Sequence, residues 1–465
     1  MIQWKDLKEI FLNESQPVLS LFYQLTLVLV LWSVNPQSLY YSWKVWGGLM
    51  LLWLGLAVWA TGGDVIRQFF SRRIWILMLW PLYNLVMSTL GVGAFYNRQI
   101  SIAFTMLIPC WFFLFRRTRE MTLIAKLAVG YIGLIAVVSL TQFFFTPNIA
   151  RDLAGIEKGY FRASPLLGNF HTVYEAIPLT VLLAGGLLLI QEKRQRMAAM
   201  VLALALSAFV LLSQYDIAML TLVLYLGGLL LVVIWRLVKI KTQGSSRQRI
   251  RTEAPDDRKN QDQELPDPNR SAGWPAWIRT NGWLTAFLVY SSPAVLLLLL
   301  KAPIDRLIYL MDLRQLAALT KLVNRLRVYL KSVVIFQEHP LLGISPLPDR
   351  TLFDLGNHSD YFDLLAEYGL VGFILFLSTW LFLVILTTRN LPVKGRWTFL
   401  LALSSFHLVF FVNPVVDVSS VIVLFFILPG LLWDFAGPAE VPMQRESELL
   451  HVPEAGSPML HSDSI

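Results

Sequence analysis

The chain has 465 residues, of which 56% are hydrophobic and only 15% are charged. Charged residues make up about a quarter of an average soluble domain, so this composition excludes an ordinary soluble protein and favours helices that cross a membrane. The single cysteine, Cys110, excludes an intrachain disulfide and a cysteine-based metal site. The net charge of +8 is informative through its distribution, because Lys and Arg in short loops set membrane orientation.

Long apolar runs recur along most of the chain, and they predict an all-α, multi-pass membrane protein. We expect about twelve transmembrane helices and a large outer loop that contains amphipathic helices. The expected spans lie near residues 17–34, 39–60, 74–94, 99–115, 122–145, 172–190, 197–213, 217–238, 281–300, 368–387, 397–413 and 418–436.

Polar stretches divide this pattern into segments. Residues 241–273 are rich in Gln, Asp, Arg, Ser and Pro and predict a disordered linker, and the tail 437–465 has a similar character. The predicted organisation is therefore an N-terminal transmembrane half with about eight spans, the linker, one span, the outer loop, the last spans and the tail. The corresponding ranges are 1–240, 241–273, 274–300, 301–367, 368–436 and 437–465.

Basic residues gather in alternate loops. They are Arg67, Arg72 and Arg73, then Arg116, Arg117 and Arg119, then Lys193, Arg194 and Arg196, then Arg389, Lys394 and Arg396. The intervening short loops carry almost none, so the positive-inside rule predicts that both termini, the linker and the tail are cytoplasmic. The loops 146–171 and 301–367 are predicted to lie outside although they carry arginines. Long loops are partly exempt from the rule; the alternative is that these arginines bind an anion outside.

Residues 311–334 have the period of an amphipathic helix, which Pro340 is expected to end. Its apolar residues fall on one face, and we expect Arg314, Lys321 and Arg325 to form a narrow cationic row on the opposite face. The same pattern suits a solvated helix face or a helix that lies on anionic lipid headgroups.

A second helix is expected to begin at Asn357 and to run directly into the span that starts near Tyr368. His358 would then lie in its first turn, where the helix dipole disfavours imidazolium and keeps the ring neutral, as a general base requires. Asp360, Asp363 and Glu367 share a face almost opposite to His358, so any carboxylate partner of His358 comes from elsewhere.

Several of these residues recur in an ordered pattern. Arg325, Tyr329, "HPLLG" (339–343), His358 and "DLLAEYGLVG" (363–372) follow one another. This pattern resembles the O-antigen ligase and O-antigen polymerase superfamily of bacterial envelope glycan assembly. The resemblance covers the whole span pattern, with motif-level agreement over about 325–375. Tyr329 stands where the family more often has tryptophan.

The loop 159–179 resembles a second element of that family through Arg162, Gly168 and Asn169. The family also has an arginine at the outer end of a central span. Here Gln214, Tyr215 and Asp216 occupy that place, which puts one phosphate contact in doubt.

The resemblance implies transfer of a glycan from an undecaprenyl-diphosphate carrier to a hydroxyl on a glycan or lipid acceptor, without a metal or other cofactor. The implied place is the outer face of the bacterial cytoplasmic membrane, with the lipid bilayer as a partner and no nucleic acid. Guanidinium groups suit a leaving diphosphate because they stay charged and match phosphate oxygens.

The implied roles are these. His358 is the base for the acceptor hydroxyl, Arg325 is catalytic, and the diphosphate is bound by Arg325, Arg162, Arg314 and Lys321, with Glu175 and Asn169 in support. Glu175 is expected to pair with an outer arginine. His407, in a late span, is expected to be hydrogen-bonded within the bundle rather than reactive.

Two alternatives remain. A transporter or flippase of lipid-linked glycans is disfavoured because transporters place ionisable residues near the bilayer midplane, and the spans here contain few. A lipid-binding scaffold protein would need only the cationic helix. Ligase and polymerase differ in their acceptor, and the choice between them stays open.

Overall fold

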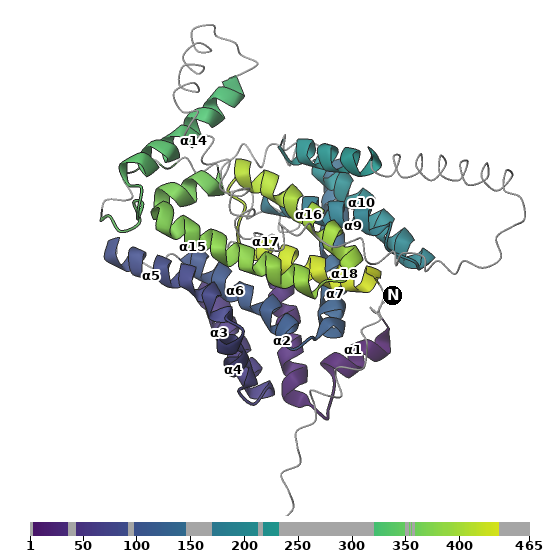
Figure 1. The fold of residues 1–465 in the computed structure, drawn as a ribbon. Coiled ribbons are helices and arrows are strands. Elements are labelled where there is room, and N and C mark those ends of the chain that lie inside the picture. Colours follow the sequence, from purple (N-terminus) through teal and green to yellow (C-terminus); the bar gives the residue numbers. More distant parts are fainter. Residues whose placement is uncertain are drawn as a thin grey trace, which may run out of the picture.

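The computed structural model describes residues 3–35, 43–91, 97–145, 170–212, 217–231, 320–348, 353, 355 and 359–436, and within these ranges the chain is helical, with no strand. The elements, drawn in Figure 1, are α1 (Trp4–Phe11), α2 (Pro17–Ser33), α3 (Trp43–Ala60), α4 (Asp64–Ser71), the 3₁₀-helix η2 (Ile74–Met78), α5 (Leu79–Gly91), α6 (Asn97–Leu114), α7 (Thr118–Phe145), α9 (Phe170–Gly186), α10 (Lys193–Leu212), α14 (Thr320–Glu338), α15 (Asp360–Asn390), α16 (Val393–Val412), α17 (Val418–Ile422), the π-helical η7 (Val423–Ile427) and α18 (Leu428–Ala436).

Six helices in the described part of the chain are long and apolar enough to cross a membrane. A seventh is added if α3 and α4, which meet at an angle of 101°, count as one bent span. Shorter apolar helices occupy Pro17–Ser33, Ile100–Leu114, Val173–Gly186 and Ile217–Leu231. The predicted all-α membrane protein is therefore confirmed, whereas the number of crossings stays a prediction.

Each predicted span except 281–300 coincides with one of these helices, and 281–300 lies outside the described residues. The predicted linker 241–273, the tail 437–465 and the first part of the outer loop, 301–319, also lie outside them. Many large apolar side chains on the helix surfaces are exposed, among them Leu51, Trp59, Leu90, Leu204 and Leu231. An apolar exterior of this extent suits a hydrocarbon environment.

Three neighbouring helices, α9, α15 and α16, run between the same two ends of the molecule. Gly185 near the end of α9 lies against Thr398 near the start of α16, and Gly186 lies against Phe435 of α18. Lys126 of α7 makes an ion pair of 2.6 Å with Asp434 of α18 at this same end. We call it the basic end, because the basic residues 116–119, 193–196 and 389–396 lie in or beside these segments.

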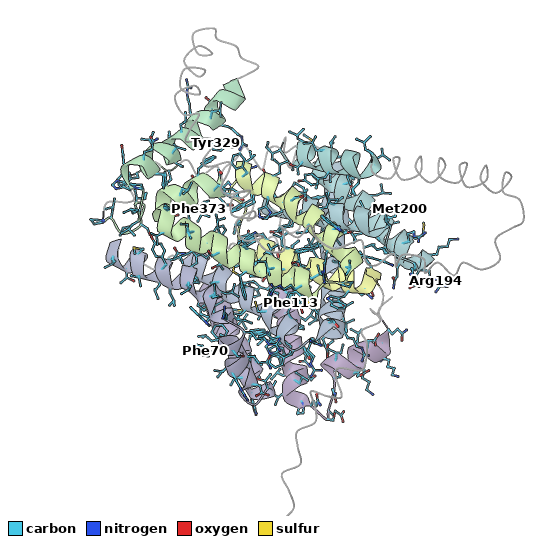
Figure 2. The ribbon with its side chains drawn as sticks, viewed as in Figure 1. Phe70, Phe113, Arg194, Met200, Tyr329 and Phe373 are labelled. Carbon is cyan, nitrogen blue, oxygen red and sulfur yellow. The ribbon has the colours of Figure 1, made fainter. Side chains whose placement is uncertain are left out.

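The opposite end consists of α14, the start of α15 and the linker 413–417 between α16 and α17, and we call it the α14 end. Tyr329 of α14 and Arg194 of α10 lie far apart at these two ends (Figure 2). With 20 residues, α16 is about 30 Å long, which is close to the thickness of the hydrocarbon core of a bilayer.

Aromatic side chains fill the core between the helices. Trp380 stacks with Phe376, Phe406 and Phe410 and meets the edge of Phe425. Its indole Nε1 donates to Nε2 of His407 at 3.0 Å, and His407 Nδ1 lies 2.8 Å from the carbonyl oxygen of Leu403. The prediction that His407 is hydrogen-bonded within the bundle is confirmed.

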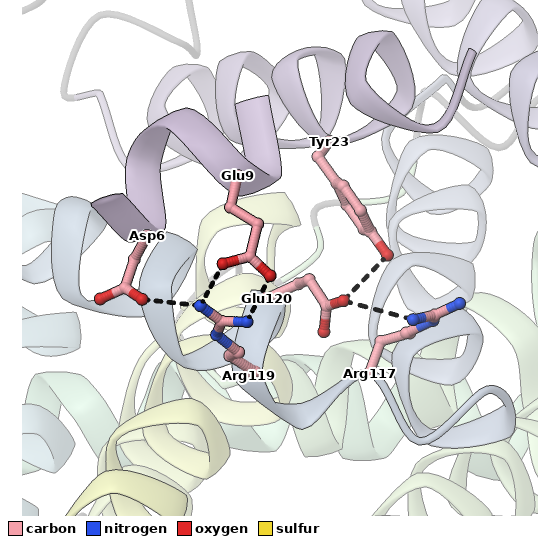
Figure 3. Close-up of polar contacts among 6 residues, drawn as sticks. All are labelled: Asp6, Glu9, Tyr23, Arg117, Arg119 and Glu120. Atoms are coloured by element: carbon pink, nitrogen blue, oxygen red, sulfur yellow. Dashed lines mark hydrogen bonds and ion pairs between the residues drawn. The ribbon is translucent and has the colours of Figure 1, made fainter. Parts of the chain in front are cut away.

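Ion pairs connect the N-terminal helix α1 to the start of α7 (Figure 3). Arg119 Nη2 donates to Asp6 Oδ1 at 2.7 Å, and Arg119 Nη1 donates to Glu9 Oε1 at 2.9 Å. Glu120 beside it accepts hydrogen bonds from Tyr23 and Arg117. The hydrogen bonds from Arg119 lower the pKa of both Asp6 and Glu9.

Helix α14 ends at Glu338, before Pro340, as predicted. The turn that follows hydrogen-bonds to a break in α15, where Gly369 has the non-helical angles φ 64° and ψ −169°. Four backbone N–H groups connect the two segments: those of residues 344 and 345 donate to the carbonyls of residues 366 and 367, and those of residues 370 and 371 donate to the carbonyls of residues 340 and 341. We call this contact, residues 340–345 against 366–371, the glycine lock.

Two glycines make the glycine lock possible. Gly343 has φ 66°, and a Cβ there would lie 2.4 Å from the carbonyl oxygen of Glu367. A Cβ at Gly369 would lie 2.4 Å from the backbone of Leu341. Only glycine combines a positive φ with so close a backbone approach. The predicted helix does run directly into its span, as α15, but with a kink at Gly369 that was not expected from the sequence.

Candidate functional site

Arg325 lies at the α14 end and reaches the last turn of α16. Its Nη1 donates to the carbonyl oxygen of Val412 at 3.2 Å and to Asn413 Oδ1 at 3.0 Å. Tyr329, one turn further along α14, donates its hydroxyl to the same Val412 oxygen at 3.0 Å. Burial raises the pKa of Tyr329, so its hydroxyl stays a proton donor.

The prediction that Arg325 lies on a cationic face opposite the buried face is wrong. Residues four apart share one side of a helix, and Tyr329 is 8% exposed, so Arg325 belongs to the stripe of α14 that meets the protein. The physical reason is that α14 lies against polar backbone groups at the end of α16, which a guanidinium satisfies and an apolar side chain cannot.

Arg325 makes no ion pair with a carboxylate in the described part of the chain. Its Nη1 makes both hydrogen bonds, and the three N–H groups on Nε and Nη2 donate to no carbonyl or carboxylate oxygen of the described residues. An anchored guanidinium with donors to spare is suited to bind an anion.

The segment 413–417, which follows α16, is held in place by hydrogen bonds to the start of α15. Asn413 is extended, with φ −138° and ψ 152°, as expected for a residue that precedes proline. Ser359 Oγ donates to the carbonyl oxygen of Phe411 at 2.6 Å. Asp360 Oδ2 accepts the backbone N–H groups of Val415 at 2.6 Å and Val416 at 2.9 Å. The carboxylate of Asp360 thus has a positioning role.

Helix α15 begins at Asp360, with Ser359 as its N-cap residue. This start lies three residues after the predicted start at Asn357, and Asn357 and His358 themselves lie outside the described residues. The side chain of Asp363 explains the later start: it accepts the backbone N–H of Ser359 at 3.2 Å and the hydroxyl of Ser332, on α14, at 2.6 Å. These bonds fix the first turn of α15 against α14.

A buried pair of carboxyl groups lies where α9 meets α17. Glu175 Oε1 accepts a hydrogen bond from Ser419 Oγ, and the same Oγ lies 2.8 Å from Asp417 Oδ1. Asp417 also caps α17 by accepting the backbone N–H of Ser420 at 2.9 Å. Ser419 has a single hydroxyl hydrogen, so it can donate to only one of the two carboxyl groups at a time.

Glu175 thus has Ser419 as its hydrogen-bond partner, where an outer arginine was expected. Asp417, which reasoning from the sequence missed, could have been found from "DVSS" (417–420), since an Asp before serines at the start of an apolar run is an N-cap signal. Asn413 was also missed. The Asn-Pro step signals the end of a helix, but nothing in the sequence connects Asn413 to Arg325.

The other predicted site residues are placed less fully. Lys321 lies in the first turn of α14, and its side chain is outside the described part of the structure. The remaining four lie outside the described residues altogether: Arg162, Asn169, Arg314 and His358. Two hollows, of about 350 and 260 Å³, are lined by residues of α2, α3, α4 and α6 and the segments beside them, and neither includes a residue of the candidate site.

Comparisons of the chain with protein-family models, curated proteins and solved structures find no match.

From the hydrogen bonds described above, the candidate site consists of Arg325, Tyr329 and Asn413 around the end of α16, and Asp360 and Asp363 support it. Chemically, this arrangement offers an anchored positive charge beside the start of α15, without a carboxylate partner among the described residues.

Proposed function

We propose that the chain is a membrane glycosyltransferase that moves a glycan from an undecaprenyl-diphosphate carrier to a hydroxyl acceptor, of the O-antigen ligase or polymerase type. The observation that carries this proposal is Arg325, which is anchored to Val412 and Asn413 and has no carboxylate partner among the described residues. Support also comes from the order of the motif residues around it in the sequence.

In the proposed reaction, the bond between the sugar C1 and the diphosphate oxygen breaks while the acceptor oxygen bonds to C1. The acceptor proton goes to His358, and the diphosphate leaves on its lipid carrier with added negative charge. Arg325, together with Arg162, Arg314 and Lys321, stabilises that charge. Removal of one such donor typically lowers a rate about 10²–10³-fold.

The proposed location is the outer face of the bacterial cytoplasmic membrane. The basic segments 116–119, 193–196 and 389–396 lie at one end of the described bundle, and the positive-inside rule puts such an end in the cytoplasm. Arg325 lies at the other end of α16. A site there keeps the polar sugars in water and the polyprenyl chain in the bilayer.

The test is a transfer assay with purified protein in liposomes that contain the lipid-linked glycan and its acceptor. We expect His358→Ala to abolish transfer and Arg325→Ala to lower it about 10²–10³-fold, while Arg327→Ala stays near the wild-type rate. Arg327 is the matched control because it is an exposed arginine on the same helix. Transfer by His358→Ala at the wild-type rate would remove the assigned base.

Disruption of the gene identifies the acceptor class. Loss of long surface glycans, with single units still made, indicates a polymerase that joins one lipid-linked unit to another. Full-length glycans that stay on the carrier indicate a ligase. Unchanged surface glycans of every kind would contradict the proposed function.

A flippase of lipid-linked glycans remains the second candidate, and the buried Glu175–Asp417 pair favours it, because ionisable groups in membrane-spanning regions often mark transport pathways. The same liposomes separate the two functions. A flippase moves the intact lipid-linked glycan between leaflets without a new glycosidic bond, and the Arg325→Ala variant would transport as well as the Arg327→Ala variant.

A further inference from the structure

Asn413 has a buried side chain that is only half satisfied. It is 7% exposed, and its Oδ1 accepts a hydrogen bond from Arg325 Nη1 at 3.0 Å. Its Nδ2 has no hydrogen-bond partner within the described part of the chain. The assignment of oxygen and nitrogen is secure because a guanidinium only donates, so the amide atom that faces it must be the oxygen.

An unsatisfied buried amide is uncommon and costly. Native proteins pair nearly all buried polar groups, and one left unpaired costs about 1–3 kcal/mol. The bond lengths of an amide place Nδ2 within about 2.5 Å of Oδ1, and therefore within about 5.5 Å of Arg325 Nη1. The unsatisfied Nδ2 of Asn413 and the guanidinium of Arg325 thus lie close together.

We propose that Asn413 is a substrate-binding residue whose Nδ2 donates to a phosphate oxygen of the lipid diphosphate beside Arg325. This inference rests on the proposed function and adds to it a residue that the family resemblance does not include. We assign an anion rather than a neutral hydroxyl as the hydrogen-bond partner of Nδ2, because the neighbouring guanidinium has no carboxylate partner among the described residues.

The surrounding structure keeps the amide in place before any ligand arrives. The backbone of Asn413 is extended ahead of Pro414, and its N–H donates to the carbonyl oxygen of Val409 at 2.8 Å. Asp360 holds the next two backbone N–H groups along the linker. The side-chain amide of Asn413 therefore has two partners in this proposal: its oxygen orients Arg325, and its nitrogen donates to the phosphate.

The substitution Asn413→Asp separates these two roles. A carboxylate still accepts the hydrogen bond from Arg325, but it cannot donate to phosphate, and it adds a negative charge beside the ligand. The matched control is Asn324→Asp, which makes the same change at an exposed position of α14. The probe is undecaprenyl diphosphate without a glycan, titrated into protein in nanodiscs, with Tm measured in parallel.

We expect Asn413→Asp to bind the probe at least tenfold more weakly than wild type at an unchanged or higher Tm, and Asn324→Asp to bind it like wild type. Equal affinity of Asn413→Asp and wild type would overturn the role of Asn413 and leave that of Arg325 standing. An equal loss in both variants would show a general charge effect and would overturn it too.

If Asn413→Asp does not fold, Asn413→Ala takes its place with the same expected tenfold loss, and wild-type affinity of that variant would overturn the inference. Failure of the wild-type protein itself to bind the probe, in contrast, would contradict the proposed function. The two failures are therefore distinguishable in one set of titrations.

Discussion

At the scale of single residues, the carboxylates near the motif have structural roles. Asp360, Asp363 and Asp417 each accept a backbone N–H near a helix end or a linker. The place of Arg325 in the motif predicts a role for this residue, and the structure shows which groups it contacts. Its contact with Val412 could not be predicted, because Val412 lies 87 residues away along the chain. The contact is also made by a backbone carbonyl, which every residue type has.

Asp360→Ala tests the positioning role of this side chain. The substitution removes two hydrogen bonds to a charged acceptor, each worth about 1.5–3 kcal/mol, so we expect a free energy of unfolding lower by about 3 kcal/mol. Thermal unfolding in detergent measures the change as a lower Tm. Glu338→Ala, at an exposed position at the end of α14, is the control and should leave Tm unchanged. An equal Tm for both variants would contradict the role.

At the scale of elements, the glycine lock decides how α14 meets α15. The end of α14 could be predicted from Pro340, because proline acts on its immediate neighbours. The break at Gly369 could not, because a glycine in an apolar run is also tolerated within a helix. Only the approach of residues 340–345 shows that the positive φ at Gly369 is required.

Gly369→Ala tests the glycine lock. A positive φ costs a residue with a Cβ about 1–2 kcal/mol, and here the backbone of Leu341 must also move, so we expect a loss of more than about 2 kcal/mol in the free energy of unfolding. The control is Gly55→Ala in α3, where a Cβ meets nothing within 4 Å; alanine there should be neutral or stabilising by up to about 1 kcal/mol. Equal Tm values for the two variants would rule out the glycine lock.

The attachment of α1 should depend on pH. The pKa values of Asp6 and Glu9 lie below their ordinary values of 3.8 and 4.5 because both carboxylates accept hydrogen bonds from Arg119. A lowered pKa contributes stability that is present above the ordinary value and lost as the pH falls through the lowered one. We expect hydrogen-exchange protection of α1, corrected for intrinsic rates, to fall between pH 7 and pH 3. In Arg119→Gln, protection should be low at both pH values; strong protection at pH 7 would contradict this.

At the scale of the whole molecule, the apolar runs predicted the helices well, because a span of this length in lipid must satisfy its own backbone hydrogen bonds. The distribution of Lys and Arg predicts which loops share one end, and within the described residues the basic segments 116–119, 193–196 and 389–396 lie near one another. The packing of α14 against α15 and α16 could not be predicted, since it depends on contacts between segments that are distant in sequence.

Cysteine labelling tests the orientation. Cys110 is the single cysteine and is buried, so the wild-type protein is an unlabelled control. In spheroplasts we expect a membrane-impermeant maleimide to label Glu338→Cys, at the α14 end, and to label Lys394→Cys, at the basic end, only after the membrane is disrupted. The reverse pattern would put Arg325 in the cytoplasm and remove the proposed function.

The glycine lock also has a consequence for ligand binding. It clamps the C-terminal end of α14, while Tyr329 and Ser332 secure the middle of the same helix to α16 and α15. Contacts at two places restrict the motion of α14, so the Arg325 guanidinium keeps its orientation before a ligand binds. If the site binds a lipid diphosphate as proposed, the anion restricts few additional rotamers on binding, which lowers the entropic cost of binding.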